Sequence, residues 1–579
     1  MFIFDIFRKK KRIPAPWKKY YSSDELNIKI PNITMYDQVR ESSLKYGDLV
    51  AIEYLGKKIK YRKFIKLIDR ACNSFYKMGV RRGDIVTICL PNVPEALISL
   101  YALNKIGAIA NMIHPLSSED EIKDSIISTN SKYFIVCDML YDKINSFIKD
   151  TMVKRTIVVS VSYFMPFFLK CGYNITNMFK YKHFYNDSFY IKFKSFMMMS
   201  CFKKYNFNYS LGKNSPAVIL HSGGTSGKPK NVVLQNRAFI LGSMQEKIAL
   251  KKLNVGDCCL AIMPNFHGFG LSVCMHTPLC LGCYTILVPQ FDSKKFDVLF
   301  NKKKPTCVLG VPTLFEALIS CSNVKNLDLS FLKYVVSGGD SLNPKLEERI
   351  NCYLASHNSS AKITQGYGMS EALAAVCLAH DDVNKSGSVG IPLPGNYIKI
   401  IDSNRKTVPY GEVGEIVINS KALMMGYLND ETETNSALQI HKDGHIWLHT
   451  GDLGYMDEDG YLFINGRVKN LIILSNGENI SPEEIENKLA LNPLVGEVIV
   501  TGEDNGLTAR IYPEQAVVEA KALDTEMIRS QLQEFLDEYN KNQPTYRRIT
   551  GLVIRKNPFI RSTTKKIRRQ DVLIDEPQA

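Results

Sequence analysis

The chain has 579 residues, of which 45% are hydrophobic and 23% are charged. These proportions exclude a disordered or fibrous chain, and the length predicts more than one domain. The formal net charge is +15, and the 14 cysteines are scattered without paired CxxC spacings, which argues against a zinc site or a disulfide framework. No apolar run reaches the roughly 20 residues that a membrane-spanning helix requires.

Two segments combine apolar or aromatic residues with basic ones. Residues 1–12 place an apolar stretch before consecutive basic residues, the reverse of a signal peptide, and residues 151–210 hold nine Lys/Arg against one acid, Asp187. A bilayer surface or an anionic, partly apolar substrate suits this pattern, whereas no nucleic-acid-binding signature is present. We therefore expect a cytoplasmic protein in which residues 1–12 are a frayed terminus. The alternative is peripheral contact at the inner face of a membrane through 1–12 and 160–206, and a surface insertion is the other interpretation of 151–210.

In chain order, residues 30–215 alternate helical and strand patterns. Tyr61–Met78 has apolar residues at helical spacing, Asp84–Leu90 is typical of a buried strand, and Val93–Gly107 is again helical. This alternation predicts a layered α/β fold that continues to about residue 400. Further strands are expected at Cys258–Met263, Tyr284–Val288, Cys307–Val311 and Tyr334–Ser337.

A loop rich in glycine and lysine, HSGGTSGKPK, occupies residues 221–230. Glycine lets backbone N–H groups close on an anion, while the hydroxyls and lysines add donors and charge, so we predict a phosphate-binding loop. Its spacing is not that of the usual mononucleotide P-loop. Apolar runs at 217–220 and 232–234 predict a strand on each side, so side chains must replace a helix dipole. A flexible Gly/Ser turn is the alternative.

The segment QGYGMSE at 365–371 combines two glycines, an aromatic residue and a carboxylate. The glycines would let the backbone approach a ligand, and the tyrosine offers a face on which a base can stack. Glu371 is suited to hold a Mg²⁺ ion that bridges phosphate oxygens. The alternative is a tight turn before a helix expected from Ser370 to Cys377.

Three further positions carry polar side chains beside turns or apolar runs. Asp340 follows an apolar strand and two glycines, the place where α/β sheets bind ligands. Asp452 follows a glycine turn and is suited to accept hydrogen bonds from ribose hydroxyls. His267 is flanked by apolar residues, a pattern that favours a hydrogen-bonded core histidine. Taken singly, each of these positions is explained by an ordinary turn or core role.

The pattern changes towards the C-terminus. Residues 398–466 shift to shorter β segments, and a domain boundary is predicted near 467–470. We expect a large N-terminal domain over 1–466 and a small α+β domain over 467–579.

Two features mark the predicted C-terminal domain. Ser481 is expected to cap a helix, with Pro482 at the first helical position and Glu484 closing a capping box. The segment 547–569 contains nine Lys/Arg and no acid. It is interpreted as a solvated basic face or as the carrier of a lysine directed at phosphate.

These stretches, in this order, resemble the adenylate-forming superfamily of acyl-CoA synthetases, amino-acid-activating domains and luciferase-like enzymes. The resemblance covers about residues 35 to 570. It rests on motifs in register: the loop 222–230, the segment 365–371, Thr450-Gly451-Asp452, Gly466-Arg467 and the terminal lysine. It implies an α/β fold whose large domain has layered α/β subdomains and a β-rich part. A small mobile C-terminal domain would pivot near Lys469.

The resemblance also implies an ATP site with Mg²⁺. The residues implied to bind ATP are Ser222, Gly223, Gly224, Thr225, Ser226, Gly227, Lys228, Gly339, Asp340, Ser341, Gln365, Gly366, Tyr367, Gly368, Asp452 and Arg467. Thr225 and Glu371 would position the metal, and His267 would line the acid-binding side. Lys566 would meet the α-phosphate, although the family usually has glycine where this chain has Lys565.

The implied reaction has two steps. A carboxylate attacks the α-phosphorus of ATP and releases pyrophosphate, and a thiol then attacks the acyl carbonyl while AMP leaves. The segments 266–271 and 558–566 look most like fatty acyl-CoA synthetases, and 265–271 and 307–315 carry no acidic or basic residue other than His267, as an apolar tail would require. We expect a medium- or long-chain fatty acid and CoA as acceptor. The alternatives are an enzyme that loads an acyl carrier protein and an inactive nucleotide- or lipid-binding relative.

Overall fold

The structure is a computed structural model. It describes residues 13–177, 187–200, 205, 211–222, 229–380, 382–473, 479–503, 506–561, 567 and 569–572. The chain divides into two compact units: unit 1 is Met1–Ile398, Ile418–His449 and Asp459–Leu462, and unit 2 is Lys399–Val417, Thr450–Glu458 and Phe463–Ala579. No described helix is both long enough and apolar enough to cross a membrane.

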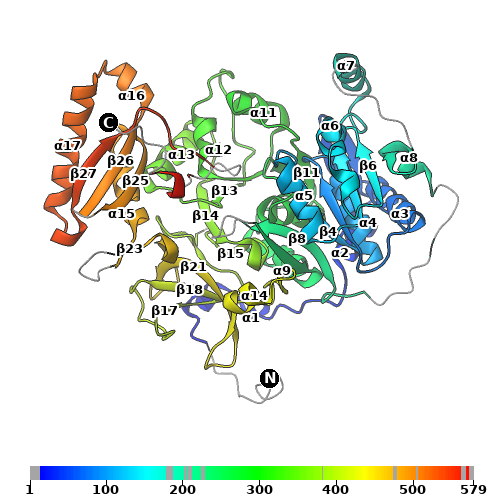
Figure 1. Ribbon diagram of the computed structural model, residues 1–579, viewed down its shortest axis with the longest axis horizontal. Helices are drawn as coiled ribbons and strands as arrows, with labels where there is room; N and C mark the ends of the chain where they lie inside the picture. The colour runs from blue at the N-terminus through cyan, green and yellow to red at the C-terminus, as the bar shows by residue number, and fades with distance from the viewer. Residues whose placement is uncertain are drawn as a thin grey trace. The chain divides into compact units, whose positions relative to one another are not determined.

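One large sheet of unit 1 runs in the order β16-β15-β14-β13-β12-β10-β11-β1-β2 (Figure 1). Its strands are β1 Val50–Tyr54, β2 Lys57–Lys60, β10 Cys258–Ala261, β11 Tyr284–Leu287, β12 Cys307–Gly310, β13 Tyr334–Gly338, β14 Ile363–Gly368, β15 Ala375–Leu378 and β16 Ile391–Pro392. The strands from β14 through β1 pair in parallel, and antiparallel strands close both edges.

A second sheet of unit 1 runs in the order β19-β9-β8-β4-β3-β5-β6-β7. Its strands are β3 Ile85–Cys89, β4 Ile109–Met112, β5 Tyr133–Cys137, β6 Arg155–Val159, β7 Tyr190–Lys192, β8 Pro216–Ser222, β9 Lys230–Gln235 and β19 Gly426–Tyr427. Pairing is parallel from β8 to β7 and antiparallel at β9 and β19. The predicted α/β fold class is confirmed.

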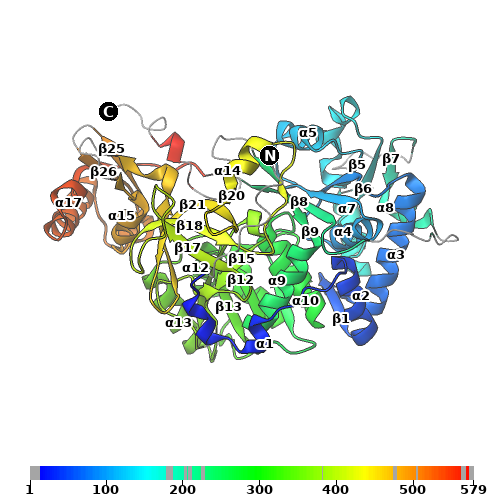
Figure 2. The ribbon, with the colours of Figure 1, turned by 90° about the horizontal axis from the view of Figure 1, so that it is seen from below.

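Helices of unit 1 form a layer that contacts both sheets (Figure 2). They are α2 Met35–Tyr46, α3 Tyr61–Met78, α4 Pro94–Ile106, α9 Asn236–Ala249 and α10 Thr277–Leu281. α4 contacts β3 and β4, whereas α3 contacts β1 and β2. Because α4 is enclosed on all sides, nearly every one of its residues is buried, and it lacks the polar stripe of a surface helix.

Sequence periodicity identified α3 and α4 well. α3 buries residues that recur at helical spacing and ends at Gly79, whose φ of 104° is accessible to glycine at low cost. The expected strands at 258, 284, 307 and 334 are all present. The helix expected from Ser370 to Cys377 is wrong: a short 3₁₀ turn, Ser370–Ala372, is followed by strand β15. Pairing with both β14 and β16 outweighs the local helical pattern.

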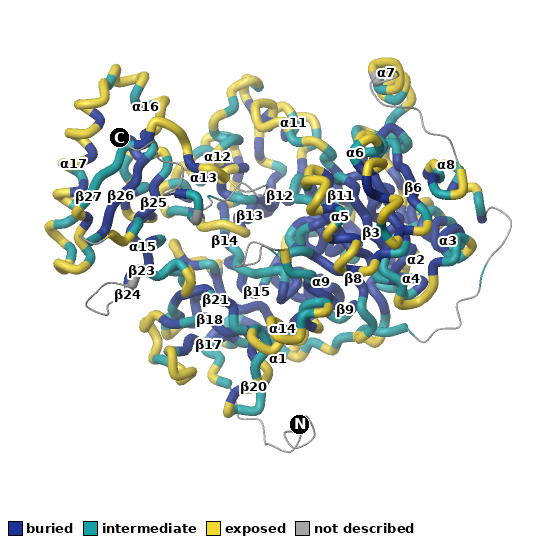
Figure 3. The backbone as a smooth tube through the Cα atoms, in the orientation of Figure 1, coloured by how far each residue is buried: buried dark blue, intermediate teal, exposed yellow. Residues whose placement is uncertain are grey.

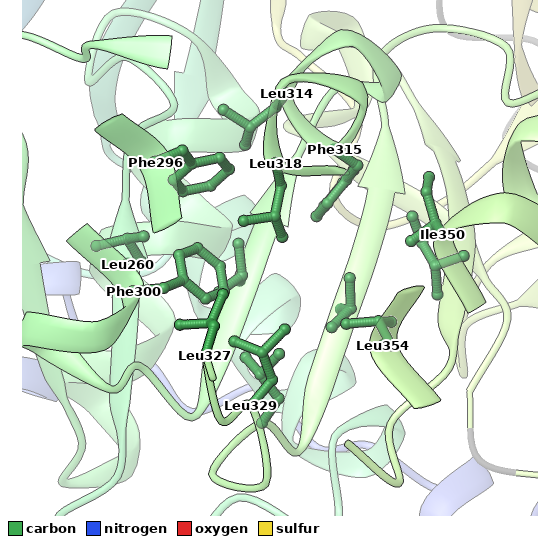
Figure 4. Close-up of a cluster of buried hydrophobic side chains, with 14 of the residues drawn as sticks. Leu260, Phe296, Phe300, Leu314, Phe315, Leu318, Leu327, Leu329, Ile350 and Leu354 are labelled. Atoms are coloured by element: carbon green, nitrogen blue, oxygen red, sulfur yellow. The ribbon is translucent and has the colours of Figure 1, made fainter. Parts of the chain in front are cut away.

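The core beside the first sheet is built from three helices that follow its strands (Figure 4). They are α11 Phe296–Lys303, α12 Pro312–Ile319 and α13 Pro344–Ser356. Phe296 and Phe300 of α11 stack at 4.6 Å, edge to face, and pack with buried residues of α12 and α13. This packing fixes the strand ends that carry the glycine-rich turns described below.

A β-rich sheet contributes strands to both units. It runs in the order β17-β18-β21-β20, and β22 pairs with β21. The strands are β17 Tyr397–Ile401, β18 Gly414–Asn419, β20 Leu438–Ile440, β21 Ile446–Met456 and β22 Leu462–Arg467. The expected shift to β structure after about residue 398 is thus present.

The rest of unit 2 is a small α+β assembly with its own core. A sheet of β25 Val495–Glu503, β26 Gly506–Pro513 and β27 Ile549–Ile554 packs against α15 Pro482–Leu489 and α17 Thr525–Lys541. The capping box expected at Ser481 is wrong. The Ser481 hydroxyl bonds the Asn465 carbonyl and the Glu483 carboxylate instead, while Glu484 pairs with Arg547 at 3.2 Å.

Candidate functional site

The phosphate-loop motif connects two antiparallel strands. β8 ends at Ser222 and β9 begins at Lys230, which are register partners. The expectation of a strand on each side of this loop is confirmed. Gly223, Gly224, Thr225, Ser226, Gly227 and Lys228 lie outside the described residues.

Two histidines lie near the start of this loop. His221 Nε2 is 2.7 Å from Asn111 Oδ1 and 3.3 Å from Ser125 Oγ. Burial, aided by the nearby His267, lowers the pKa of His221 to about 4, so its ring is neutral at pH 7. His267 is half-buried, and its ring centroid lies 5.0 Å from that of Phe266. The His267 position is therefore close to the strand that leads into the loop.

A chain of contacts connects the far end of the loop to Glu371. Lys230 pairs with Glu433 and lies 4.9 Å from the ring centroid of Tyr427. The Tyr427 hydroxyl donates to Glu371 Oε1 at 3.0 Å. Glu371 is only 6% exposed. Tyr427 is thus a site residue that sequence reasoning missed, because the local sequence Gly-Tyr of β19 has no distinctive signal.

The segment after Glu371 packs against the turn that carries His267. Leu373 has a φ of 74°, which is strained for a non-glycine residue, and is 2% exposed. A Cβ at Gly268 would overlap the Leu373 carbonyl oxygen, so this close approach requires glycine there. The packing brings the positions of His267 and Glu371 into one region of unit 1.

Two parallel strands present their carboxyl ends side by side. In the register of β13 and β14, Ser337 faces Gln365 and Gly338 faces Gly366. Gly339 follows with a φ of 79°, and the exposed Asp340 and Ser341 come next. Parallel sheets bind ligands at this edge. The predicted residues of segments 339–341 and 365–368 are therefore brought together.

The glycines of the 365–371 motif have a structural explanation. A Cβ at Gly368 would overlap the backbone of Ala374, and one at Gly366 would lie 3.1 Å from a Leu378 methyl group. Both positions face the partner strand β15, where the register shifts between Tyr367 and Gly368. The side chain of Tyr367 is half-buried at the same strand end.

Asp452 and Arg467 lie together in unit 2. Arg467 Nε is 2.8 Å from Asp452 Oδ1, and the aspartate side chain is 8% exposed. Thr450 Oγ1 accepts the Asp452 N–H at 3.0 Å and donates to the Ile416 carbonyl at 2.7 Å. The carboxylate is thereby held on β21 in a fixed orientation.

The remaining predicted positions lie near the C-terminus. Lys469 is exposed on the short 3₁₀ turn Val468–Asn470. Lys565 and Lys566 lie outside the described residues.

Known proteins share this arrangement. The family model described as "AMP-binding enzyme" matches residues 39–428, and that of "AMP-binding enzyme C-terminal domain" matches 469–575. The chain is 29% identical over 500 residues to a long-chain-fatty-acid–CoA ligase of Bacillus subtilis, covering 84% of this chain and 86% of the relative. It is 27% identical over 566 residues to probable 4-coumarate–CoA ligase 1 of Dictyostelium discoideum, covering 97% and 98%. The structure of ATP-bound MatB from Rhodopseudomonas palustris matches with a TM-score of 0.78 at 21% identity, covering 94% of this chain and 98% of that one.

Proposed function

This chain belongs to the AMP-binding enzyme family and is an adenylate-forming acid–thiol ligase, and we propose that its acid is a medium- or long-chain fatty acid and its acceptor the thiol of CoA. The apolar character of 265–271 and 307–315 carries the choice of acid. Neither segment contains Asp, Glu, Lys or Arg, and an apolar tail requires such a lining. The fatty-acid ligase of Bacillus subtilis among the relatives supports this choice.

We assign the nucleotide to the edge where β8, β13 and β14 end. Residues 222–228 would hold the β- and γ-phosphates, and Tyr367 would stack near the adenine, whose edge would lie against 339–341. Asp452 would accept hydrogen bonds from the ribose hydroxyls, and Arg467, its ion-pair partner, would reach the nucleotide. The short ion pair supports this role because it orients the carboxylate before the ligand arrives.

Glu371 fits a magnesium ligand. It is a nearly buried carboxylate whose Oε1 accepts the Tyr427 hydroxyl, and it keeps a second oxygen that Mg²⁺ would take together with Thr225. When bound, the ion would neutralise phosphate charge. Tyr427 fixes the carboxylate, and Lys230 contributes positive charge at the end of the loop.

The obstacle to the first step is repulsion between the carboxylate and the phosphates. The loop lysines and Lys566 would offset this repulsion and stabilise the crowded phosphorus centre, so positioning and preorganised charge would supply most of the rate. His267 would line the acid side, near the reacting carboxylate. In the second step, the domain 467–579 would turn about Lys469, withdraw Lys566 and admit the thiol.

The pyrophosphate-release assay described below also tests two alternatives to this function. An acyl carrier protein would replace CoA as the acceptor, and an inactive relative would bind nucleotide or lipid without turnover. We propose a cytoplasmic enzyme with peripheral membrane contact through 1–12 and 160–206. Residues 1–12 lie outside the described chain.

Pyrophosphate release from ATP and Mg²⁺ should be measured with fatty acids from octanoate to stearate and with 4-coumarate. We expect release with the fatty acids, followed by thioester formation when CoA is added. Faster release with 4-coumarate would overturn the choice of acid, and thioester formation only with an acyl carrier protein would overturn the choice of acceptor. If no acid gives pyrophosphate release, the protein is the inactive relative that binds nucleotide or lipid without turnover.

A further inference from the structure

Helix α7, Phe167–Asn177, exposes apolar side chains to solvent. The exposed fractions are 74% for Phe167, 87% for Phe168, 53% for Leu169 and 69% for Ile175. Figures 1 and 3 show α7 at the outer edge of unit 1, standing off the helices beside it. Large apolar side chains exposed together on one short helix mark an interaction site.

The apolar residues surround the first turn of α7. Successive residues of an α-helix are about 100° apart, so Phe167, Phe168 and Leu169 point in different directions. Phe168 and Ile175 are seven residues apart and share one face, on which Cys171 is also exposed. One flat protein surface can cover a single face of this turn, whereas a bilayer surrounds a turn that inserts into it.

Basic side chains lie beside the helix. Lys170 of α7 is 5.7 Å from the ring centroid of Tyr163, and Lys57 of β2 is 5.8 Å from that of Phe164. The pKa of Lys57 is lowered, first by burial and then by the positive charges of Lys63 and Lys170. Lys57 is therefore close enough to both Lys63 and Lys170 to be repelled by them, which an anionic partner would relieve.

Further basic residues lie in the segment around Lys57. Residues 57–66 contain six Lys/Arg and no acid. Within it, Arg62 is paired with Asp48 at 2.9 Å. Glu95 also acts on Lys57, but burial raises its pKa to about 8, so it is neutral at pH 7 and offsets little of the charge.

We propose that α7, together with Lys57, Lys63 and Lys170, is a docking surface for a bilayer that contains anionic lipids. Phe167, Phe168 and Leu169 enter the boundary between headgroups and acyl chains, while the lysines contact lipid phosphates. The structure brings Lys57 near Lys170 of α7, although about a hundred residues separate them in the chain. This proposal rests on the membrane contact proposed above for 160–206, and it assigns that contact to α7 and to anionic lipid. It does not rest on the choice of acid, because the surface binds lipid whether or not the enzyme turns over.

Vesicle flotation with the full chain tests the proposal without ATP or acid. We expect binding to phosphatidylcholine vesicles that contain about one third phosphatidylglycerol to be about tenfold tighter than to phosphatidylcholine alone, and to weaken with salt. The double variant Phe167→Ser/Phe168→Ser should lose about tenfold or more of this binding. Lys57→Gln/Lys63→Gln/Lys170→Gln should remove the preference for anionic vesicles.

Leu169→Ser has a matched control in Leu44→Ser, because Leu44 is 73% exposed on α2, outside the surface. We expect Leu169→Ser to weaken flotation and Leu44→Ser to leave it unchanged. Thermal unfolding curves like that of the wild type establish that the variants are folded. Failure of the wild type to float with anionic vesicles at low salt would overturn the proposal, and so would unchanged flotation of the double phenylalanine variant. Equal binding to neutral vesicles would overturn the assigned role of the lysines.

Discussion

At the residue scale, the contact of Tyr427 with Glu371 shows how the site is supported. Glu371 is recognisable from its motif, but the hydroxyl that orients it comes from residue 427, on a different sheet. The Lys230 ammonium lies over the same ring. A carboxylate held by a phenol keeps one orientation, which a metal ligand requires.

Tyr427→Phe removes this hydrogen bond and keeps the ring. We expect pyrophosphate release at limiting Mg²⁺ to fall about tenfold, since a hydrogen bond to a charged group contributes about 1.5 kcal/mol, and to recover partly at high Mg²⁺. Titrating the rate against Mg²⁺ measures this. Tyr54→Phe is the control, because the Tyr54 hydroxyl donates to the Val161 carbonyl at 2.9 Å, in another hydrogen bond. An unchanged Mg²⁺ dependence in Tyr427→Phe would refute the positioning role.

The adjacent lysines near the C-terminus permit a paired test. Lys566→Ala should slow adenylate formation by a factor of about a hundred or more, corresponding to about 3 kcal/mol of transition-state stabilisation. Lys565→Ala should have a small effect. Thioester formation from chemically prepared acyl-adenylate should persist in Lys566→Ala. If the larger loss occurs in Lys565→Ala instead, the assignment of the α-phosphate contact is wrong.

At the element scale, the strands were predicted more reliably than the turn that begins at Ser370, within the 365–371 motif. The hairpin of β8 and β9 follows from apolar runs on both sides of a glycine loop. The conformation of segment 370–377 does not follow from its own sequence. Leu373 takes a positive φ that non-glycine residues disfavour, and β15 then pairs with two strands. Only packing against Gly268 and the neighbouring strands accounts for that conformation.

Helix α4 buries Glu95 fully, with no hydrogen-bond partner for either carboxylate oxygen in the described chain. Burial raises its pKa from 4.5 to about 8. Between these values the unfolded chain has released a proton that the folded protein keeps, so stability falls as pH rises from 4.5 to 8. Glu95→Gln should therefore raise the thermal midpoint at pH 8, by an amount corresponding to about 4 kcal/mol, and change it little at pH 5.

Thermal unfolding of both proteins across this pH range checks the prediction. Glu348→Gln, at an exposed position on α13, is the control and should follow the wild type. A Glu95→Gln midpoint that runs parallel to the wild type over the whole range would contradict it.

At the scale of the whole molecule, the predicted boundary near 467 remains a prediction. The two units divide the β-rich sheet, so segments 399–417 and 450–458 fall with the C-terminal part. The main core of that part, however, is formed by residues between Ile480 and Ile549, with partly buried neighbours from Ile472 to Ile554, and a smaller cluster adds Phe559 and Val572. A contiguous core of this kind is what an independently folding domain requires.

A fragment of residues 467–579 should therefore fold by itself. We expect a cooperative thermal transition by circular dichroism and dispersed amide resonances by NMR. Leu532→Ala should abolish or strongly lower that transition, because Leu532 is fully buried and large-to-small core changes cost about 2–5 kcal/mol. A fragment that is unfolded alone but folds when 399–417 is supplied would place the boundary elsewhere.

The sequence by itself determined the alternating α/β pattern, the strands on both sides of the phosphate loop and the order of the motifs. These features are local: periodicity and glycine spacing are properties of contiguous residues. Tertiary structure decided which distant segments meet. Examples are Tyr427 on Glu371, Leu373 on Gly268, and Lys57 of β2 near Lys170 of α7. The physical reason is that such contacts come from the pairing and packing of whole elements, which no short stretch of sequence encodes.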